Sequence, residues 1–337
     1  MQSRLQRKQE LCSSALKKQE EFWAMLRESR LRVALPWSSS GSDSPTTSSN
    51  SGLGVQRVPG HRKTTELHAL HQQRAGKAMG SEIVYLMYHE LEVPGRTVCS
   101  LDPGYFRYVV PLSDFAQQME ALKEDGWTGV SVGEALSTPA DKAVVITFDD
   151  GCETDFVAAA PVLRSLNFNA TFYITSGFVG ARGYLTTEQL RELYKLGFEI
   201  GCHSMTHAYL PDLNDADLRH EIADSKFYLE DVLDCSITHF SCPGGRCNRR
   251  VKNAVRAAGY RSLATSWPHS NSTSPEPYAL GRTVVMRRTP LPQFEALCRG
   301  RGLWKLSLRA GVYHGAMRIL GSSFYDRVRG AVLSKVS

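Results

Sequence analysis

The sequence lacks the features that mark membrane-spanning, exported and disulfide-rich proteins. It has no run of about 18 apolar residues, the length that a membrane-spanning helix needs, and its N-terminus has no continuous apolar segment of the signal-peptide kind. None of its eight cysteines forms a Cys-x-x-Cys pair, and in a chain of 337 residues they do not indicate a disulfide framework. We therefore expect a cytoplasmic protein in a reducing compartment.

The sequence also lacks the usual marks of a nucleotide or nucleic-acid site. No Gly-x-Gly-x-x-Gly or Gly-x-x-x-x-Gly-Lys motif follows a predicted strand. The net charge of +6 comes from the two ends, since residues 1–78 carry 13 Lys/Arg against 6 Asp/Glu and residues 291–337 carry 8 against 2. The middle keeps 19 against 26, or −7, and therefore has no basic excess. We expect no nucleic-acid partner.

Composition divides the chain into three parts. Residues 1–80 form a basic extension that we predict to be mostly disordered, with a stretch rich in Ser, Gly, Thr and Pro at 36–60. Met79 stands just before the first predicted strand, which leaves open whether the residues before it are native. Residues 81–290 are predicted to form the main domain. Residues 291–337 are predicted to form a basic amphipathic helical tail, which either packs across the bottom of that domain or contacts a membrane surface.

Strands and helices alternate through the main domain with short connections. This order is typical of a mainly parallel sheet with right-handed crossovers, either open and doubly wound or closed like a barrel. The predicted strands cover residues 83–88, 127–132, 144–150, 170–175, 198–201, 237–241, 260–265 and 283–286, and the predicted helices cover 113–125, 153–166, 187–196, 214–233 and 248–258.

One apolar run ends in two adjacent acids. Residues 144–151 read VVITFDDG, which is typical of a buried strand that ends in Asp149, Asp150 and a turn-forming glycine. Two carboxylates at the end of a buried strand need a cation or a proton near them, and sites in α/β folds lie at this end of the strands. The alternative is an exposed Asp-Asp-Gly turn.

A second strand is followed by two histidines. His203 and His207 stand four residues apart and can meet one metal ion if the turn between them is helical. In a parallel sheet they emerge at the same end as Asp150. Two imidazoles and one carboxylate leave open positions on a Zn²⁺-like ion, which is typical of a catalytic site. The alternative is two loop histidines with ordinary hydrogen bonds.

Two neighbouring acids suit hydrolysis of an amide. One carboxylate holds the metal, and the other stays free to take a proton from the attacking water as general base. The metal polarises the carbonyl group, and a further group gives a proton to the leaving nitrogen. These roles require two acids of different function side by side.

The motifs TFDDG at 147–151 and HSMTH at 203–207, with their separation, resemble the polysaccharide deacetylases with the NodB-homology domain, carbohydrate esterase family 4. The resemblance covers residues 83–290 and implies a distorted (β/α) barrel of about seven strands. It implies that Asp149 is the general base. It also implies that Asp150, His203 and His207 hold a divalent metal, usually Zn²⁺, with Co²⁺ or others as alternatives.

Two further motifs match the family less closely. Residues 240–246 resemble its third motif; there Pro243, Gly244 and Gly245 are expected to shape a groove wall, and Arg246 either orients Asp149 or is a surface arginine. The C-terminal Leu-x-His motif that supplies the general acid is missing. The segment Met87-Tyr88-His89 resembles the start of the domain in exopolysaccharide N-deacetylases, which makes His89 the expected acid in preference to His269.

These features predict a metal-dependent N-deacetylase of an amino sugar in a polysaccharide or glycan precursor. The partner would be an N-acetylated glycan, and the oligomeric state is not indicated. A deformylase or deacetylase of a lipid-linked amino sugar, with a peripheral membrane contact through residues 291–337, is one alternative. A catalytically silent glycan-binding domain is the other.

Overall fold

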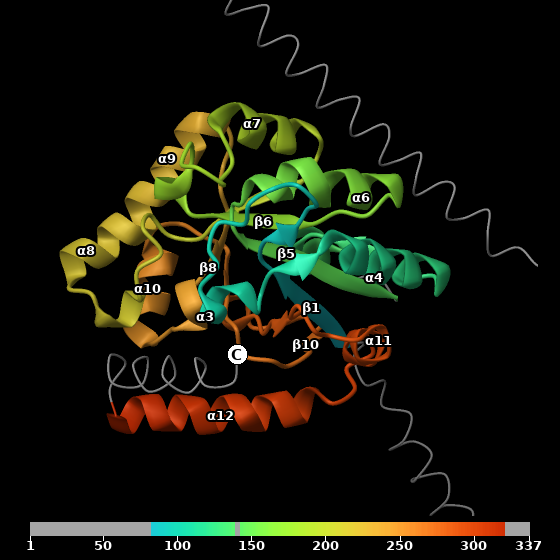
Figure 1. Ribbon diagram of the computed structural model, residues 1–337. Helices are drawn as coiled ribbons and strands as arrows, with labels where there is room; N and C mark the ends of the chain where they lie inside the picture. Colours follow the sequence, from blue (N-terminus) through green and yellow to red (C-terminus); the bar gives the residue numbers. More distant parts are fainter. Residues whose placement is uncertain (1–81, 139–141, 321–337) are drawn as a thin grey trace, which may run out of the picture. The chain divides into compact units, whose positions relative to one another are not determined.

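The computed structural model describes residues 82–138 and 142–320, with side chains to Val312 in the last helix. Its centre is a curled, mainly parallel sheet surrounded by helices (Figure 1). Seven strands form a continuous hydrogen-bonded path, in the order β10 (Asn271–Ser272), β1 (Glu82–Tyr88), β5 (Ala143–Asp150), β6 (Thr171–Ile174), β7 (Glu199–Cys202), β8 (His239–Ser241) and β9 (Ser262–Ala264).

Two short strands lie beside this path and help to close it. Strand β4 (Thr128–Val130) pairs with the first half of β5, and β11 (Thr283–Val284) pairs with β1. The segment before β11 also reaches the far end of the path, because Leu280 exchanges hydrogen bonds with Leu263 and Thr265 around β9. The predicted distorted (β/α) barrel is thereby confirmed. Strands β2 (Leu91–Glu92) and β3 (Val110–Pro111) form a separate two-stranded sheet.

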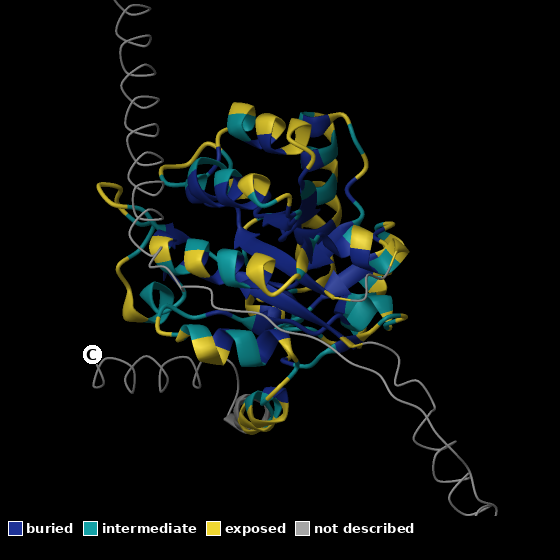
Figure 2. Ribbon diagram, turned by 90° about the vertical axis from the view of Figure 1, so that its right-hand side faces the viewer, coloured by how far each residue is buried: buried dark blue, intermediate teal, exposed yellow. Residues whose placement is uncertain are grey.

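Helices cover the outside of the sheet. Their buried faces are apolar and their outer faces are exposed (Figure 2). The helices are α3 (Pro103–Phe106), α4 (Leu112–Glu124), α5 (Val132–Ser137), α6 (Ala160–Ser165), α7 (Thr187–Lys195), α8 (Asp215–Arg219), α9 (Ser225–Leu233), α10 (Arg249–Ala257), α11 (Leu291–Cys298) and α12 (Leu303–Leu320), with π-helical turns at Asp155–Ala159 and His220–Asp224.

Local sequence explains where several helices begin. Thr186 and Gln189 form a capping box at the start of α7, and Asn214 and Asn248 cap α8 and α10 with their side chains. The starts predicted at residues 214 and 248 are therefore confirmed. The helix predicted from Thr187 is capped one residue earlier, by Thr186.

Strand β5 forms the middle of the core, and all eight of its residues are buried. Side chains of a strand alternate between its two faces. Phe148 points outward, where it stacks between Tyr88 and Phe172 of the neighbouring strands and meets Phe115 of α4 edge-on. Val145 points into the barrel. The alternation thus assigns the odd-numbered residues of β5 to the barrel interior, which places Asp149 there as well.

The predicted tail begins with two helices. Helix α11 packs against α4 and buries Phe294, Leu297 and Cys298. Helix α12 buries Leu303 but exposes Trp304, Leu308 and Val312. No helix among the described residues is both long and apolar enough to cross a membrane. The boundaries predicted at residues 80 and 290 stay predictions, and residues 1–80 lie outside the described part of the chain.

Candidate active site

Asp149 and Asp150 bring both carboxylates to the carboxyl end of β5. Asp149 points into the barrel, as strand alternation requires. Asp150 would follow Phe148 outward, but its φ of +83° lies in a region that non-glycine residues rarely occupy. The resulting twist leaves both carboxylates beside one histidine, with His203 Nε2 3.9 Å from an Asp149 oxygen and 3.6 Å from Asp150 Oδ1.

The two histidines follow β7 on a turn that is not helical. We expected the two histidines to meet one metal ion only if the turn between them was helical. That expectation was wrong, because His207 has a φ of +64° and Ser204 a φ of +69°. This turn still places the two imidazole rings 5.1 Å apart. It is held by the buried carboxylate of Glu221, which accepts hydrogen bonds from the N–H groups of Met205 and Thr206, each at 2.9 Å.

Asp150, His203 and His207 form a set of atoms that fits a divalent cation. Their nearest donor atoms all lie within 4.8 Å of one another, and His207 Nε2 is 3.4 Å from Asp150 Oδ1. That oxygen is buried without a hydrogen-bond partner in the described part of the chain. His203 Nδ1 lies 3.0 Å from the carbonyl oxygen of Ser241, so Nδ1 carries the proton and donates it to that oxygen. Nε2 is therefore unprotonated, and its lone pair is available to a metal ion.

Arg282 holds Asp149 in place. Its guanidinium group donates to both carboxylate oxygens, from Nη1 to Oδ1 at 2.6 Å and from Nη2 to Oδ2 at 2.7 Å. It also donates to Thr147 and Ser241, so the fully buried cation is surrounded by acceptors. A bidentate arginine–carboxylate pair of this kind fixes the plane of the carboxylate. The orienting contact that the sequence suggested for Arg246 is thus made by Arg282.

The charges around Asp149 determine its protonation. Burial raises the pKa of this carboxyl, but the attraction of Arg282 and His203 more than offsets that effect and holds the pKa below its ordinary range. Burial is also the main cause that lowers the pKa of His203, to about 4. At neutral pH Asp149 is therefore ionised and His203 is neutral, which are the forms that a base and a metal ligand need.

The third motif forms a wall beside the histidine turn. Pro243, Gly244 and Gly245 make a 3₁₀ turn after β8, and both glycines have positive φ. A Cβ atom on Gly244 would lie 2.9 Å from the Tyr209 ring, so glycine permits a close approach there. Arg246 places its guanidinium carbon 3.5 Å from the centre of the same ring. This motif therefore packs on Tyr209, two residues after His207.

His89 and His269 lie toward different ends of strand β1. His89 directly follows Tyr88, which pairs with Phe148, so it stands level with Asp149 at the site. Its Nδ1 is buried without a hydrogen-bond partner among the described residues, and its ring lies 5.0 Å from that of Tyr108. His269 packs on Gly281 and neighbours Ser270, which bonds Glu82 at the start of β1. Seven residues of strand, roughly 20 Å, separate Glu82 from His89.

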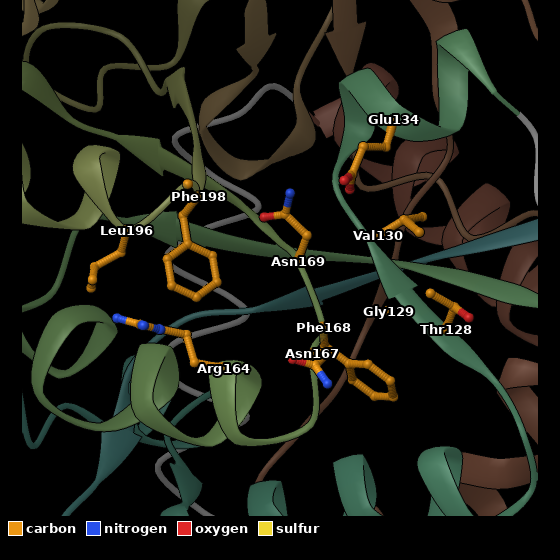
Figure 3. Close-up of a pocket in the computed structure, with 11 residues that line it drawn as sticks. Thr128, Gly129, Val130, Glu134, Arg164, Asn167, Phe168, Asn169, Leu196 and Phe198 are labelled. Atoms are coloured by element: carbon orange, nitrogen blue, oxygen red, sulfur yellow. The ribbon is translucent and has the colours of Figure 1, made fainter.

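A pocket of about 280 Å³ lies elsewhere in the barrel. It is lined by residues at the starts of β4, β6 and β7, among them Gly129, Phe168 and Phe198, and by Arg164 of α6 (Figure 3). These strand starts are at the opposite end of the sheet from Asp149 and Asp150. The pocket is therefore not part of this site.

Sequence reasoning missed two residues that hold the site together. Arg282 stands just before the buried strand β11, and a charged residue next to an apolar run was a signal that could have been used. Glu221 is one of several acids in a polar helical stretch, and nothing in the sequence distinguishes it from the others. Both are recognised by their contacts.

Comparison with known proteins gives consistent matches. Residues 137–263 match the family model of polysaccharide deacetylases, a segment that contains both acid and histidine motifs. The chain is 31% identical over 182 residues to a Bacillus subtilis protein assigned to the polysaccharide deacetylases, covering 52% of this chain and 65% of that one. It is 33% identical over 128 residues to the peptidoglycan-N-acetylglucosamine deacetylase of Bacillus cereus, covering 38% and 58%.

A solved structure shows the same architecture. A deacetylase of Streptococcus pyogenes, determined in complex with acetate, superposes with a TM-score of 0.59 and 25% identity, covering 65% of this chain and 99% of that one. The two curated relatives are longer than the matched region, since this chain spans 65% and 58% of their lengths. The segment that matches the family model contains β5 to β8 with their carboxyl-end motifs.

Proposed function

From the premise that residues 137–263 belong to a polysaccharide deacetylase domain, as the motifs indicated, we propose that this chain is a divalent-metal-dependent hydrolase that removes N-acetyl groups from an amino sugar. One observation carries the proposal. A His–His–Asp donor set stands beside a second carboxylate that is ionised and fixed by a buried arginine. Catalytic metal sites of hydrolases leave open positions in such donor sets. The catalytic domain is proposed to cover residues 81–290.

Asp149 is proposed as the general base. Its low pKa keeps it ready to accept a proton, and Arg282 keeps its carboxylate directed at the donor set. Asp150, His203 and His207 would hold a cation such as Zn²⁺, and that ion would polarise the acetyl carbonyl and make the attacking water acidic enough for a base of low pKa. Asp149 then takes the water's proton as the oxygen attacks the carbonyl carbon.

His89 is proposed as the general acid. Departure of the sugar amine requires a proton on its nitrogen, and His89 stands level with Asp149 at the same strand ends. The attraction of His89 is one of the causes that lower the pKa of Asp149, so the two side chains lie near each other. His269 lies toward the start of the strand and cannot reach that nitrogen. Tyr209, with Gly244 and Arg246 packed on it, is proposed to form the groove wall beside the substrate.

Acetate release with and without metal tests the proposal. We expect metal-stripped full-length protein to release no acetate from N-acetylated glucosamine oligosaccharides, and protein refilled with Zn²⁺ or Co²⁺ to release it. The relative from Bacillus cereus, which acts on N-acetylglucosamine of peptidoglycan, supports this choice of panel. Formate release from an N-formylated or lipid-linked amino sugar would favour the alternative substrate. Metal bound without release from any of these substrates would favour a silent glycan-binding domain.

Replacement of His89 is expected to separate the two candidate acids. Because a positioned acid contributes about 10²–10⁴ in rate, His89→Asn should lower kcat by that factor and leave metal content unchanged. His269→Asn is the matched control and should keep kcat within about a factor of 2, since it lies away from the reacting atoms. Rates are measured as acetate release over pH 5–9. A large loss in the His269 variant alone would contradict the assignment.

A peripheral membrane contact through residues 291–337 is a further part of the proposal, and α12 supports it. Trp304, Leu308 and Val312 recur every fourth residue and are 66%, 65% and 66% exposed. Lys305 and Arg309 lie between them, so basic side chains that attract anionic lipid stand next to exposed apolar ones. Over its whole length α12 has no single apolar face, so the predicted amphipathic pattern was wrong for this helix. Co-sedimentation with anionic vesicles should fall in the double variant Trp304→Ser, Leu308→Ser, and unchanged co-sedimentation would count against the contact.

A further inference from the structure

A second group of metal-ligating side chains lies beside the site, and it has no part in the proposed reaction. Glu90, Cys99 and Cys152 come from three separate segments, and one donor atom of each lies within 4.8 Å of the others. Glu90 and Cys152 are buried and Cys99 is half-buried. We propose that these three residues bind a second, structural metal ion, of the thiolate-preferring kind represented by Zn²⁺.

The distance between the two sulfur atoms fits a shared metal. Two thiolates on one tetrahedral Zn²⁺, each about 2.3 Å from the metal, are about 3.8 Å apart. Cys99 Sγ and Cys152 Sγ are 4.0 Å apart, close to that value and well beyond the bonded distance of about 2.0 Å in a disulfide. Thiolate donors select Zn²⁺ and other soft ions over Mg²⁺ and Ca²⁺. The pair therefore determines the class of ion.

A buried acid next to this group independently indicates a cation. Asp155 is completely buried, and neither of its carboxylate oxygens has a hydrogen-bond partner in the described residues. Among the ion pairs of the described residues, none joins a lysine or arginine to Glu90 or Asp155. A divalent ion at this group supplies the missing positive charge.

Hydrogen bonds from neighbouring groups already hold these donors in position. The N–H of Cys99 donates to both oxygens of Glu90, at 3.1 and 2.9 Å, which fixes these two ligands relative to each other. Tyr105 donates to Glu90 Oε2 at 2.9 Å and lies 3.6 Å from Cys152 Sγ. Such hydrogen bonds hold ligands in position and tune them. The donor set is thus arranged before any ion arrives.

The second ion would fasten a connecting segment to the catalytic strand. Cys99 lies in the loop between β2 and β3, whereas Cys152 follows the end of β5 by two residues. The two metal groups share no ligand atom, because the first uses Asp150, His203 and His207. This proposal therefore concerns metal content and thiolate ligation, and it holds or fails independently of the deacetylase activity.

Metal counting on the full chain tests it. We expect full-length protein, purified with a reductant and loaded with Zn²⁺, to hold two equivalents by elemental analysis. The double variant His203→Ala, His207→Ala should keep one, and Cys99→Ser, Cys152→Ser should also keep one. Loading with Co²⁺ should give the near-ultraviolet thiolate-to-cobalt absorption in the wild type and in the histidine variant, but not in the cysteine variant.

Cys235→Ser is the matched control, because Cys235 is a half-buried free cysteine outside the group. It should keep two equivalents and the cobalt absorption. The wild-type cobalt spectrum decides the question even if the cysteine variant folds poorly. One equivalent in the wild type without thiolate absorption would overturn the proposal. A mass lower by two hydrogens, locating a Cys99–Cys152 disulfide in protein that holds a single metal, would overturn it as well.

Discussion

Asp149→Asn is expected to lower acetate release by about 10³-fold or more while metal binding at Asp150, His203 and His207 continues. A general base contributes about 10²–10⁴ in rate, and an amide cannot accept the proton from water. Asparagine keeps the size of aspartate, but it leaves the buried charge of Arg282 without its partner, so the fold of the variant is checked by circular dichroism before rates are compared. The measurement is kcat for acetate release beside metal content from elemental analysis of the same preparation.

Asp150→Asn is compared with Asp149→Asn to distinguish the metal ligand from the general base. Asp150 Oδ1 faces both histidines, so its replacement should reduce metal content as well as rate. The two adjacent acids are thereby distinguished, since one variant loses rate with metal retained and the other loses both. Equal metal loss in the two variants would contradict the division of roles between base and ligand.

Arg282→Met is expected to destabilise the fold by about 3–5 kcal/mol, because it leaves the buried charge of Asp149 without a partner. The activity should fall too, since Asp149 loses both hydrogen bonds that set its plane. Chemical denaturation monitored by circular dichroism measures the first effect and acetate release the second. Arg282→Lys should recover part of the stability and little of the rate, because an ammonium group cannot bind both oxygens side by side.

The pH dependence of this stability has a defined sign. The pKa of Asp149 is lower in the folded protein than in the unfolded chain, so the pair stabilises the fold fully above the unfolded value of about 3.9. That contribution is lost as the pH falls from there towards the folded pKa. The stability difference between wild type and Arg282→Met should therefore shrink in acid.

Arg256→Met is the control for a lost arginine. Arg256 pairs with Glu276 at the surface, with side chains 48% and 61% exposed. Exposed pairs contribute about 0–1 kcal/mol, so this variant should unfold almost as the wild type does. An equal loss of stability in the two arginine variants would contradict the role of the buried pair.

The sequence alone determined the fold class and the main parts of the site. Alternating apolar runs and capped helices predicted a mainly parallel sheet, because strand and helix periodicities are local properties that burial enforces. Its closure into a barrel was implied by the family resemblance. The acid pair and the histidine pair each follow a strand, and parallel strands bring their carboxyl ends to one edge. That is why Asp149, Asp150, His203 and His207 could be named together before any coordinates.

Tertiary structure alone decided the contacts between residues far apart in the chain. Arg282 meets Asp149 across 133 positions because the barrel closes, and no local pattern indicates which of many arginines makes that contact. The turn of His203 and His207 is likewise held by Glu221, from a helix that follows it. The resemblance already favoured His89 over His269 as the acid, and only the packed sheet shows that the two lie toward different ends of β1. Local periodicity determines elements, whereas partners of buried charges are set by how those elements pack.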